Sequence, residues 1–303
     1  MRVEIPAALA GERVDRAIAL LTGQARAAVA DLVAAGAVRL DGQPVATRGR
    51  RVGAGEVLEV DLPASAPTAL RPDPGVLVDV LWCDDQVAVV NKPAGLVVHP
   101  GAGHASGTLV QGLLARFPSL AEGPGDPQRP GLVHRLDKGT SGLLAVALTP
   151  AALASLRSQL QARTVDRRYT TLVWGAVEAT EGHIDAPVGR ATSDPTRMAV
   201  SHRGRVARTR YQVLGRYEAP ALLTLLECRL ETGRTHQIRV HLAAIGHPVV
   251  GDARYGGARA ELPAPRPFLH AGRLGFDHPV SGERVDVSAP LPEDLKELHG
   301  RIH

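Results

Sequence analysis

The sequence predicts an α+β protein with a large mixed, mainly antiparallel sheet flanked by helices, preceded by a small α/β module. Two observations favour this fold class: segments with strand character outnumber helical segments, and short hairpin turns join several of them. A third observation is the Pro-rich stretch 63–75, PASAPTALRPDPG, which lacks periodicity and marks a linker between two domains.

The first domain is expected over residues 1–62. Apolar residues recur at helical spacing from Val14, and after a short break the pattern resumes and ends at Gly36, a suitable helix C-cap. Two short strands are expected to follow, at residues 38–40 and 57–62. The apolar content of this module is thin, so its core is expected to be small.

The second domain, residues 76–303, is expected to begin with a hairpin in which VLVDVLWC and QVAVVNKP flank the turn DD. The apolar run LLAVAL (143–148) predicts a buried strand. It leads into Thr149 as a helix N-cap and Pro150 at the first helical position, so a helix is expected over 150–162.

The rest of the second domain adds strands at YTTLVWGAV, ARTRYQVL and LLTLLECRL. Helices are expected over 108–117 and 235–245. In the second of these, Thr235 would be the N-cap, and Gly246 and Pro248 would end the helix.

Composition excludes several classes of protein. With 44% hydrophobic and 22% charged residues and no apolar run long enough for a membrane span, the chain is expected to be soluble and cytoplasmic. The two cysteines, Cys83 and Cys228, are isolated, which leaves neither a disulfide framework nor a CxxC metal site. The His pairs in the polar stretches, His99/His104 and His236/His241, are five residues apart and do not share a face, so no metal site is expected.

Positive charge is concentrated in one segment. The net charge is only +4, but seven Arg and a single acid, Asp194, lie between Arg190 and Arg216, giving 7 − 1 = +6. Such a strip suits a phosphate backbone. A solvated face in an Arg-rich protein, with 32 Arg and three Lys, is an equally good interpretation of the charge alone.

Three polar stretches carry the chemistry. The loop HRLDKGTSG (134–142) places His, Arg, Asp and Lys just before a buried strand, where a rigid scaffold can hold functional side chains. For Asp137 alone, a turn carboxylate paired with a neighbouring base is the simpler interpretation. The companions NKPAGLVVHP (91–100) and LETGRTHQIRVHLAAIGHPVVGD (230–252) change that balance.

Together these stretches resemble the RluA-type family of RNA pseudouridine synthases over about 77–290, and HPGAG and LETGRTHQIRVH look most like its RluD subgroup. The N-terminal arrangement of two helices, GAVRLDGQPV and VGAGEVLEVD resembles an S4-type RNA-binding domain. It departs from that pattern at Ala25 and Asp41, and its eight Arg are balanced by eight acids. RNA affinity there would depend on a local face that includes Arg26.

The resemblance implies an enzyme that detaches uracil from the anomeric carbon, turns it and rejoins it through ring carbon 5. Its substrates would be uridines of large-subunit ribosomal RNA or of its assembly intermediates. No atoms or electrons are gained or lost, so a carboxylate suffices and no cofactor is implied. The protein is expected to act as a monomer without membrane or metal partners.

The resemblance also assigns roles to single residues. Asp137 would be the catalytic carboxylate, as a nucleophile or as a base on the sugar, and Arg234 would be the guanidinium that keeps it ionised. Tyr169 would contact the uracil. Arg135 would fill the space of the extruded base, because an enzyme acting on a base in structured RNA must unstack it. Further RNA contacts are expected from Lys138, Ile238, Arg203, Arg205 and Arg208.

Each of these residues also has a structural interpretation: Arg234 as a surface residue before a helix, Tyr169 as a core residue of a strand, and Arg135 as an ion-pair partner. Two other functions remain as alternatives. A non-catalytic RNA-binding or ribosome-assembly factor could share the fold but would not need Asp137. A glycoside hydrolase would need a second acid near Asp137, and the companion stretches offer Lys92 and Arg234 instead.

Overall fold

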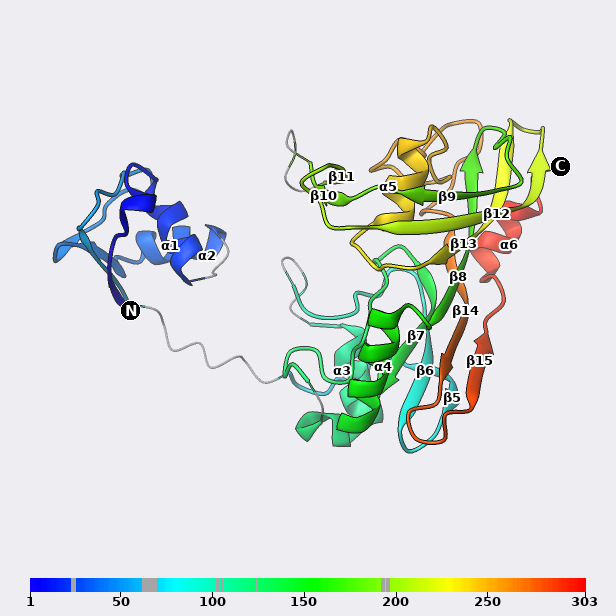
Figure 1. Cartoon of the computed structure of the whole chain (residues 1–303), viewed down its shortest axis with the longest axis horizontal. Helices are drawn as coiled ribbons and strands as arrows, with labels where there is room; N and C mark the ends of the chain where they lie inside the picture. The colour runs from blue at the N-terminus through cyan, green and yellow to red at the C-terminus, as the bar shows by residue number, and fades with distance from the viewer. Residues whose placement is uncertain are drawn as a thin grey trace. The chain divides into compact units, whose positions relative to one another are not determined.

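The structure, a computed structural model, describes residues 1–22, 26–61, 70–101, 104, 106–123, 125–191, 194 and 197–303, with only the backbone at Arg26 and Ala27. The chain divides into two compact units, Met1–Thr68 and Ala69–His303 (Figure 1). Most of the predicted linker lies outside the described residues. No helix within the described ranges is long and apolar enough to cross a membrane.

The first unit contains a short 3-10 helix at Ala7–Leu9, the helices α1 (Val14–Thr22) and α2 (Arg26–Ala34), and the strands β1 (Arg2–Glu4), β2 (Val38–Leu40), β3 (Gln43–Pro44) and β4 (Val57–Val60). The strands form an antiparallel sheet in the order β1-β4-β2-β3. Gly36 adopts a φ of +72° after α2, as predicted for a helix C-cap. Two helices followed by a small antiparallel sheet agree with an S4-like module.

The second unit contains the helices α3 (Leu109–Arg116), α4 (Pro150–Ala162), α5 (Gln237–Ala244) and α6 (Glu293–His299), and a 3-10 helix at Pro118–Glu122. Its strands are β5 (Asp79–Cys83), β6 (Val87–Lys92), β7 (Ser141–Ala147), β8 (Asp166–Trp174), β9 (Glu181–Asp185), β10 (Val188–Arg190), β11 (Met198–Val200), β12 (Arg208–Tyr217), β13 (Leu223–Leu230), β14 (Leu269–Asp277) and β15 (Arg284–Ser288).

Nine of these strands form one sheet in the order β5-β6-β7-β14-β8-β13-β12-β9, with β15 paired to β14. The pairing of β14 with β7 is parallel, and the other pairings in this sheet are antiparallel. This is the mixed, mainly antiparallel α+β sheet that the sequence predicts. The strands β10 and β11 form a separate antiparallel pair.

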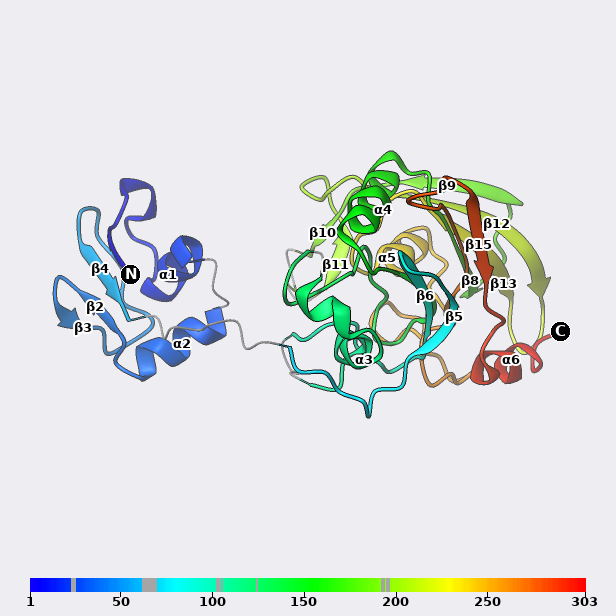
Figure 2. The same cartoon turned by 90° about the horizontal axis from the view of Figure 1, so that it is seen from below.

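Helices cover both faces of the large sheet. α3 and α5 share one apolar cluster with alternate residues of β6, β7, β8 and β13. The residues between them belong to the other face, where α4 packs on β6, β7 and β14, and α6 packs on β8 and β13. Figure 2 shows α3 and α5 on one side of the sheet and α6 on the other. The polar loop 134–142 leads into the first residues of β7, on the face of the sheet that α5 covers.

Candidate active site

The loop HRLDKGTSG is fixed at both ends. Gly142, its last residue, has a φ of +114° and pairs with Ala271 of β14. A Cβ there would lie 2.3 Å from the carbonyl oxygen of Ala271. At the start of the loop, His134 Nε2 accepts the backbone N–H of Ala145 at 3.1 Å. Arg266 Nη1 donates to the carbonyl of Gly139 at 3.2 Å. Asp137 therefore sits on a loop with a defined backbone position.

Lys92, the last residue of β6, contacts the same loop with its side chain. Its side chain is fully buried, and Nζ donates to the carbonyls of Pro93 at 2.7 Å and Leu96 at 3.0 Å, with the Lys138 carbonyl 3.5 Å away. Burial lowers the pKa of Lys92 to about 7, while the charge of Asp137 opposes the shift. The NKP stretch thus contributes a buried amine next to the loop.

The ion-pair partner of Asp137 is Arg239. Arg239 Nη1 donates to Asp137 Oδ2 at 3.2 Å, and both side chains are largely buried. The other carboxylate oxygen, Oδ1, has no hydrogen-bond partner among the described residues, so it can accept a substrate group. A carboxylate whose one oxygen is bound by a guanidinium and whose other oxygen is left over is suited to act as a nucleophile or a base.

Arg239 is in turn oriented by Asp252, which is fully buried. Arg239 Nε and Nη2 bind the two oxygens of this carboxylate at 2.6 and 2.9 Å, the two-pronged geometry in which guanidinium groups bind carboxylates best. Burial lowers the pKa of Arg239, but the bonds to Asp252 and Asp137 outweigh it and raise that pKa overall. The result is a chain of three charges, Asp137, Arg239 and Asp252.

His236 and Tyr255 complete this end of the site. His236 Nε2 lies 3.9 Å from Asp137 Oδ2, and Nδ1 lies 2.8 Å from the Tyr255 hydroxyl. That hydroxyl accepts the backbone N–H of Met198 at 3.2 Å and can give its own proton to Nδ1. Burial lowers the pKa of His236, and the charge of Asp137 opposes that shift. Because Nδ1 can accept the proton of the Tyr255 hydroxyl, a neutral ring would carry its own proton on Nε2, facing Asp137.

Arg234, predicted as the partner of Asp137, is placed differently. Its Nε donates to the carbonyl of Val206 at 3.0 Å, and no ion pair joins Arg234 to Asp137 in the described chain. The reason is the start of α5: Thr235 is not the N-cap as predicted, because His236 takes that place with a φ of +57°. The helix begins at Gln237, which brings Arg239 to the carboxylate.

A small cavity of about 50 Å³ lies against Asp137. Tyr169 of β8 and Ile238 of α5 line it together with the apolar side chains of Leu136, Leu230 and Leu269. Tyr169 is 5% exposed, and burial raises its pKa, so its phenol is neutral at ordinary pH. Flat apolar walls beside a carboxylate suit a single aromatic base.

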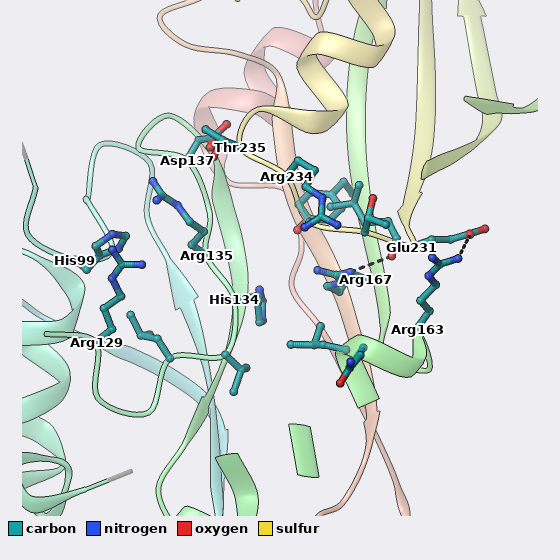
Figure 3. Close-up of a pocket in the computed structure, with 18 residues that line it drawn as sticks. His99, Arg129, His134, Arg135, Asp137, Arg163, Arg167, Glu231, Arg234 and Thr235 are labelled. Carbon is teal, nitrogen blue, oxygen red and sulfur yellow. Dashed lines mark hydrogen bonds and ion pairs between the residues drawn. The ribbon is translucent and has the colours of Figure 1, made fainter. Parts of the chain in front are cut away.

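A larger cavity of about 560 Å³ shares Asp137, Tyr169, Arg135 and Arg234 with the small one. Figure 3 shows Asp137 and Thr235 at its upper end and His134, Arg129, Arg163 and Arg167 in its lower half. Five arginines and two carboxylates line it: Arg129, Arg135, Arg163, Arg167, Arg234, Asp137 and Glu231. Such a cationic hollow next to a small, partly apolar pocket favours a nucleic-acid strand as the ligand.

Comparison with known proteins agrees with this geometry. Residues 86–244 match the family model described as RNA pseudouridylate synthase. An uncharacterized RNA pseudouridine synthase, YlyB of Bacillus subtilis, is 44% identical over 288 residues, which cover 95% of this chain and 93% of that protein. The chain belongs to this family.

Two more proteins are similar over most of this chain. Ribosomal large subunit pseudouridine synthase D of Xanthomonas campestris is 45% identical over 307 residues, 97% of this chain and 90% of that protein. The solved structure of human RNA pseudouridylate synthase domain containing 1 is 30% identical with a TM-score of 0.59, covering 77% of this chain and 90% of that one. The protein is thus an RNA pseudouridine synthase of the RluA type.

The remaining predicted residues of this synthase lie around the cavities or outside them. Arg135 is exposed and lines both cavities, and Lys138 Nζ lies 3.3 Å from His104 Nε2. Arg203 and Arg205 lie between β11 and β12. Arg208 begins β12, and its Nε donates to Asp185 at 2.9 Å. The side chain of Arg26 lies outside the described residues.

Sequence reasoning missed Arg239, Asp252 and His236 as members of the site. Two signals were available. Arg239 stands in HQIRVH, and Asp252 is the last residue of the segment 230–252. Both residues belong to this segment, which carried the resemblance. Nothing in their spacing indicates which of the stretch's cations reaches Asp137.

Proposed function

We propose that this RNA pseudouridine synthase modifies uridines of large-subunit (23S) ribosomal RNA in the cytoplasm. Support comes from near-full-length relatives named ribosomal large subunit pseudouridine synthase D, among them those of Xanthomonas campestris and Nitrosomonas europaea. The cationic cavity beside the small pocket at Asp137 is compatible with a structured RNA strand.

Within this function, Asp137 would act on the target uridine, with Oδ1 directed to the sugar or the base. Arg239 would hold the carboxylate in position through its hydrogen bond to Oδ2, inside a pocket from which bound RNA excludes water. Tyr169 and Ile238 would hold the uracil ring in the small cavity while its bond to the sugar is broken and remade. Arg135, at the mouth of both cavities, would occupy the space that the base leaves.

The N-terminal unit would contribute RNA affinity as an S4-type module over residues 1–62, followed by the linker 63–75 and the catalytic domain 76–303. The module has no excess of positive charge, so a local face must provide its contacts. Arg26→Gln combined with Arg48→Gln should therefore weaken RNA binding without lowering turnover at saturating RNA. Unchanged affinity would remove the module from RNA recognition.

The experiment for the target is a map of pseudouridine in ribosomal RNA from a strain that lacks this gene. One or more large-subunit positions should lose pseudouridine, and wild-type protein but not Asp137→Asn should restore them. An intact map would contradict the proposed target. Loss of pseudouridine that Asp137→Asn also restores would show that the chain acts without this carboxylate, as a non-catalytic assembly factor would.

A further inference from the structure

Arg167 is a buried cation that no carboxylate of the described residues neutralises. It lies on β8 two residues before Tyr169 and is 7% exposed. Its Nη2 donates to the carbonyl of Leu230 at 3.3 Å, and this is the one hydrogen bond of the Arg167 side chain among the described residues. Nε is buried without a partner, and no carboxylate in the described ranges pairs with the guanidinium. Arg167 therefore has donors and charge to spare.

A buried charge without a counter-ion is costly, and arginine cannot escape the cost by losing its proton at physiological pH. Its neighbour Arg168 shows the ordinary solution. Arg168 points to the opposite side of β8 and binds Asp166 at 2.8 Å and Glu227 at 3.1 Å. The unpaired state of Arg167 is thus a property of the face that borders the cavity.

His134 adds a second unpaired donor at the same place. Its Nε2 accepts the N–H of Ala145, so the neutral ring carries its proton on Nδ1. Nδ1 is buried and has no partner among the described residues. Burial, and then the charge of Arg167, lowers the pKa of His134 to about 3, so the ring stays a neutral donor. The two side chains offer donors and no free acceptor.

The walls of the cavity do not supply the missing anion. Glu231 is shared between Arg210 at 2.6 Å and Arg163 at 3.8 Å. Asp137 at the far end is held by Arg239. Figure 3 shows Arg167 and His134 in the lower half of the cavity, away from Asp137. The counter-charge must therefore come from the ligand.

We propose that Arg167, with His134 beside it, forms a subsite for a phosphodiester that flanks the target uridine. The proposal rests on the RNA pseudouridine synthase activity and adds a contact to it. Along a strand, residues two apart are separated by about 7 Å, close to the length of one nucleotide unit. With the base held at Tyr169, an adjoining phosphodiester would reach Arg167.

An uncharged group, such as the edge of a neighbouring base, could accept from the same N–H groups. It would leave the buried positive charge without compensation, whereas a phosphodiester oxygen satisfies both the donors and the charge. The chemistry of the subsite therefore favours the phosphodiester. Its effect would be to make the enzyme recognise a nucleotide within a strand rather than a nucleoside.

The test combines a protein change with a neutralised linkage in the RNA. The substrate is a short RNA fragment that the wild-type protein converts, prepared with a neutral methylphosphonate at each linkage next to the target uridine in turn. Arg167→Met should lower kcat/KM roughly 10- to 100-fold through KM. One methylphosphonate should lower the wild-type value similarly and have no further effect on Arg167→Met. Arg168→Met is the matched control and should remain sensitive to that linkage.

If the loss of kcat/KM from Arg167→Met multiplies with the loss from the methylphosphonate at both flanking linkages, the two changes act independently. Arg167 would then not contact either phosphodiester, and the proposal would be overturned. If Arg167→Met instead has no further effect once the neighbouring base is substituted, the subsite binds a base edge. That outcome likewise overturns the proposal. Arg167→Lys guards against misfolding: it should keep part of the sensitivity because the positive charge remains. Wild-type turnover of the fragment establishes the activity separately, so its failure is distinguishable from failure of the subsite.

Discussion

Two buried arginines at this site are held in opposite ways. Arg239 is 9% exposed and lies between two carboxylates, Asp137 and Asp252. Arg167 is 7% exposed and has only the carbonyl of Leu230 as its partner in the described chain. The difference separates two tasks. The compensated arginine orients a reactive carboxylate before RNA arrives, whereas the uncompensated one is left to meet a charge that the RNA brings.

Lys92 shows a third way to bury a cation. Its pKa of about 7 means that the amine can lose its proton when desolvation is costly, which a guanidinium cannot do. Three buried cations near one loop thus use three different responses to the same penalty: pairing, proton loss and an uncompensated charge. The following changes test this contrast.

Asp137→Asn should have the largest effect, with turnover falling on the order of 10³-fold or more, because the amide keeps the shape but has neither basicity nor nucleophilicity. The measurement is release of label from ring carbon 5 of uridine in RNA. RNA affinity should change little. Turnover close to that of the wild type would show that Asp137 is not the catalytic carboxylate.

Arg239→Met should follow closely, because it leaves two carboxylates without their shared partner and costs about 3–5 kcal/mol of stability. Loss of the guanidinium also removes the group that orients Oδ2 of Asp137. Turnover in the label-release assay should therefore be low. Arg239→Lys should also be poor, since an ammonium lacks the two-pronged geometry.

Arg234→Met is the control for that experiment. Arg234 lines both cavities but binds the Val206 carbonyl instead of Asp137, so the kcat of Arg234→Met should stay close to that of the wild type. A large loss of kcat in Arg234→Met, with a near-normal kcat in Arg239→Met, would restore Arg234 as the partner of the carboxylate in the bound state.

These two arginines also mark how far the sequence could predict the site. Local signals sufficed for α4, where Thr149 accepts the N–H of Ala152 and Pro150 opens the helix as predicted. They failed at α5, because the left-handed conformation of His236 and the bonds of Gln237 to Arg208 and Thr209 set where that helix begins. Those bonds join α5 to β12, which lies almost thirty residues earlier in the chain, and no local pattern encodes them.

The loop and six strands of the second unit (β5, β6, β7, β8, β12 and β13) were predictable from local patterns, whereas β9, β10, β11, β14 and β15 were not predicted. Alternating or continuous apolar runs determine which residues a sheet buries, and HRLDKGTSG carries its glycines where the backbone needs them, at Gly142 above all. Which cation would face Asp137 depended on the register between α5 and that loop. The unpaired state of Arg167 depended on the whole cavity.

Asp252→Asn should have a smaller effect than either change at Asp137 or Arg239. The amide oxygen can still accept one hydrogen bond from Arg239, but the amide NH2 cannot accept the other, so one charge-assisted hydrogen bond is lost, which corresponds to about tenfold in turnover. The loss should appear in kcat more than in KM, since Asp252 acts through Arg239. A change confined to KM would mean that Asp252 shapes RNA binding instead.

Lys92→Met should change how stability depends on pH. Below pH 7 both the folded and the unfolded states hold the Lys92 proton, whereas between about 7 and 10.5 the unfolded state holds more. The free energy of unfolding from this group therefore rises with pH in that window. Denaturant unfolding followed by tryptophan fluorescence reports on the second unit, which contains both Trp82 and Trp174. Equal slopes in variant and wild type would show that Lys92 stays charged when folded.

The smallest effect is expected from the basic strip. Arg208 is tied to Asp185 and Arg210 to Glu231, so these charges are already balanced within the protein. Arg203 and Arg205 have no ion pair among the described residues and remain available to phosphates. Arg203→Gln with Arg205→Gln should flatten the slope of log affinity against log salt by about 0.7 for each phosphate that the protein no longer neutralises. Arg208→Gln, the matched control, should flatten it less. An unchanged slope in the double variant would make the strip a solvated surface, and a large change in Arg208→Gln would mean that its pair with Asp185 opens when RNA binds.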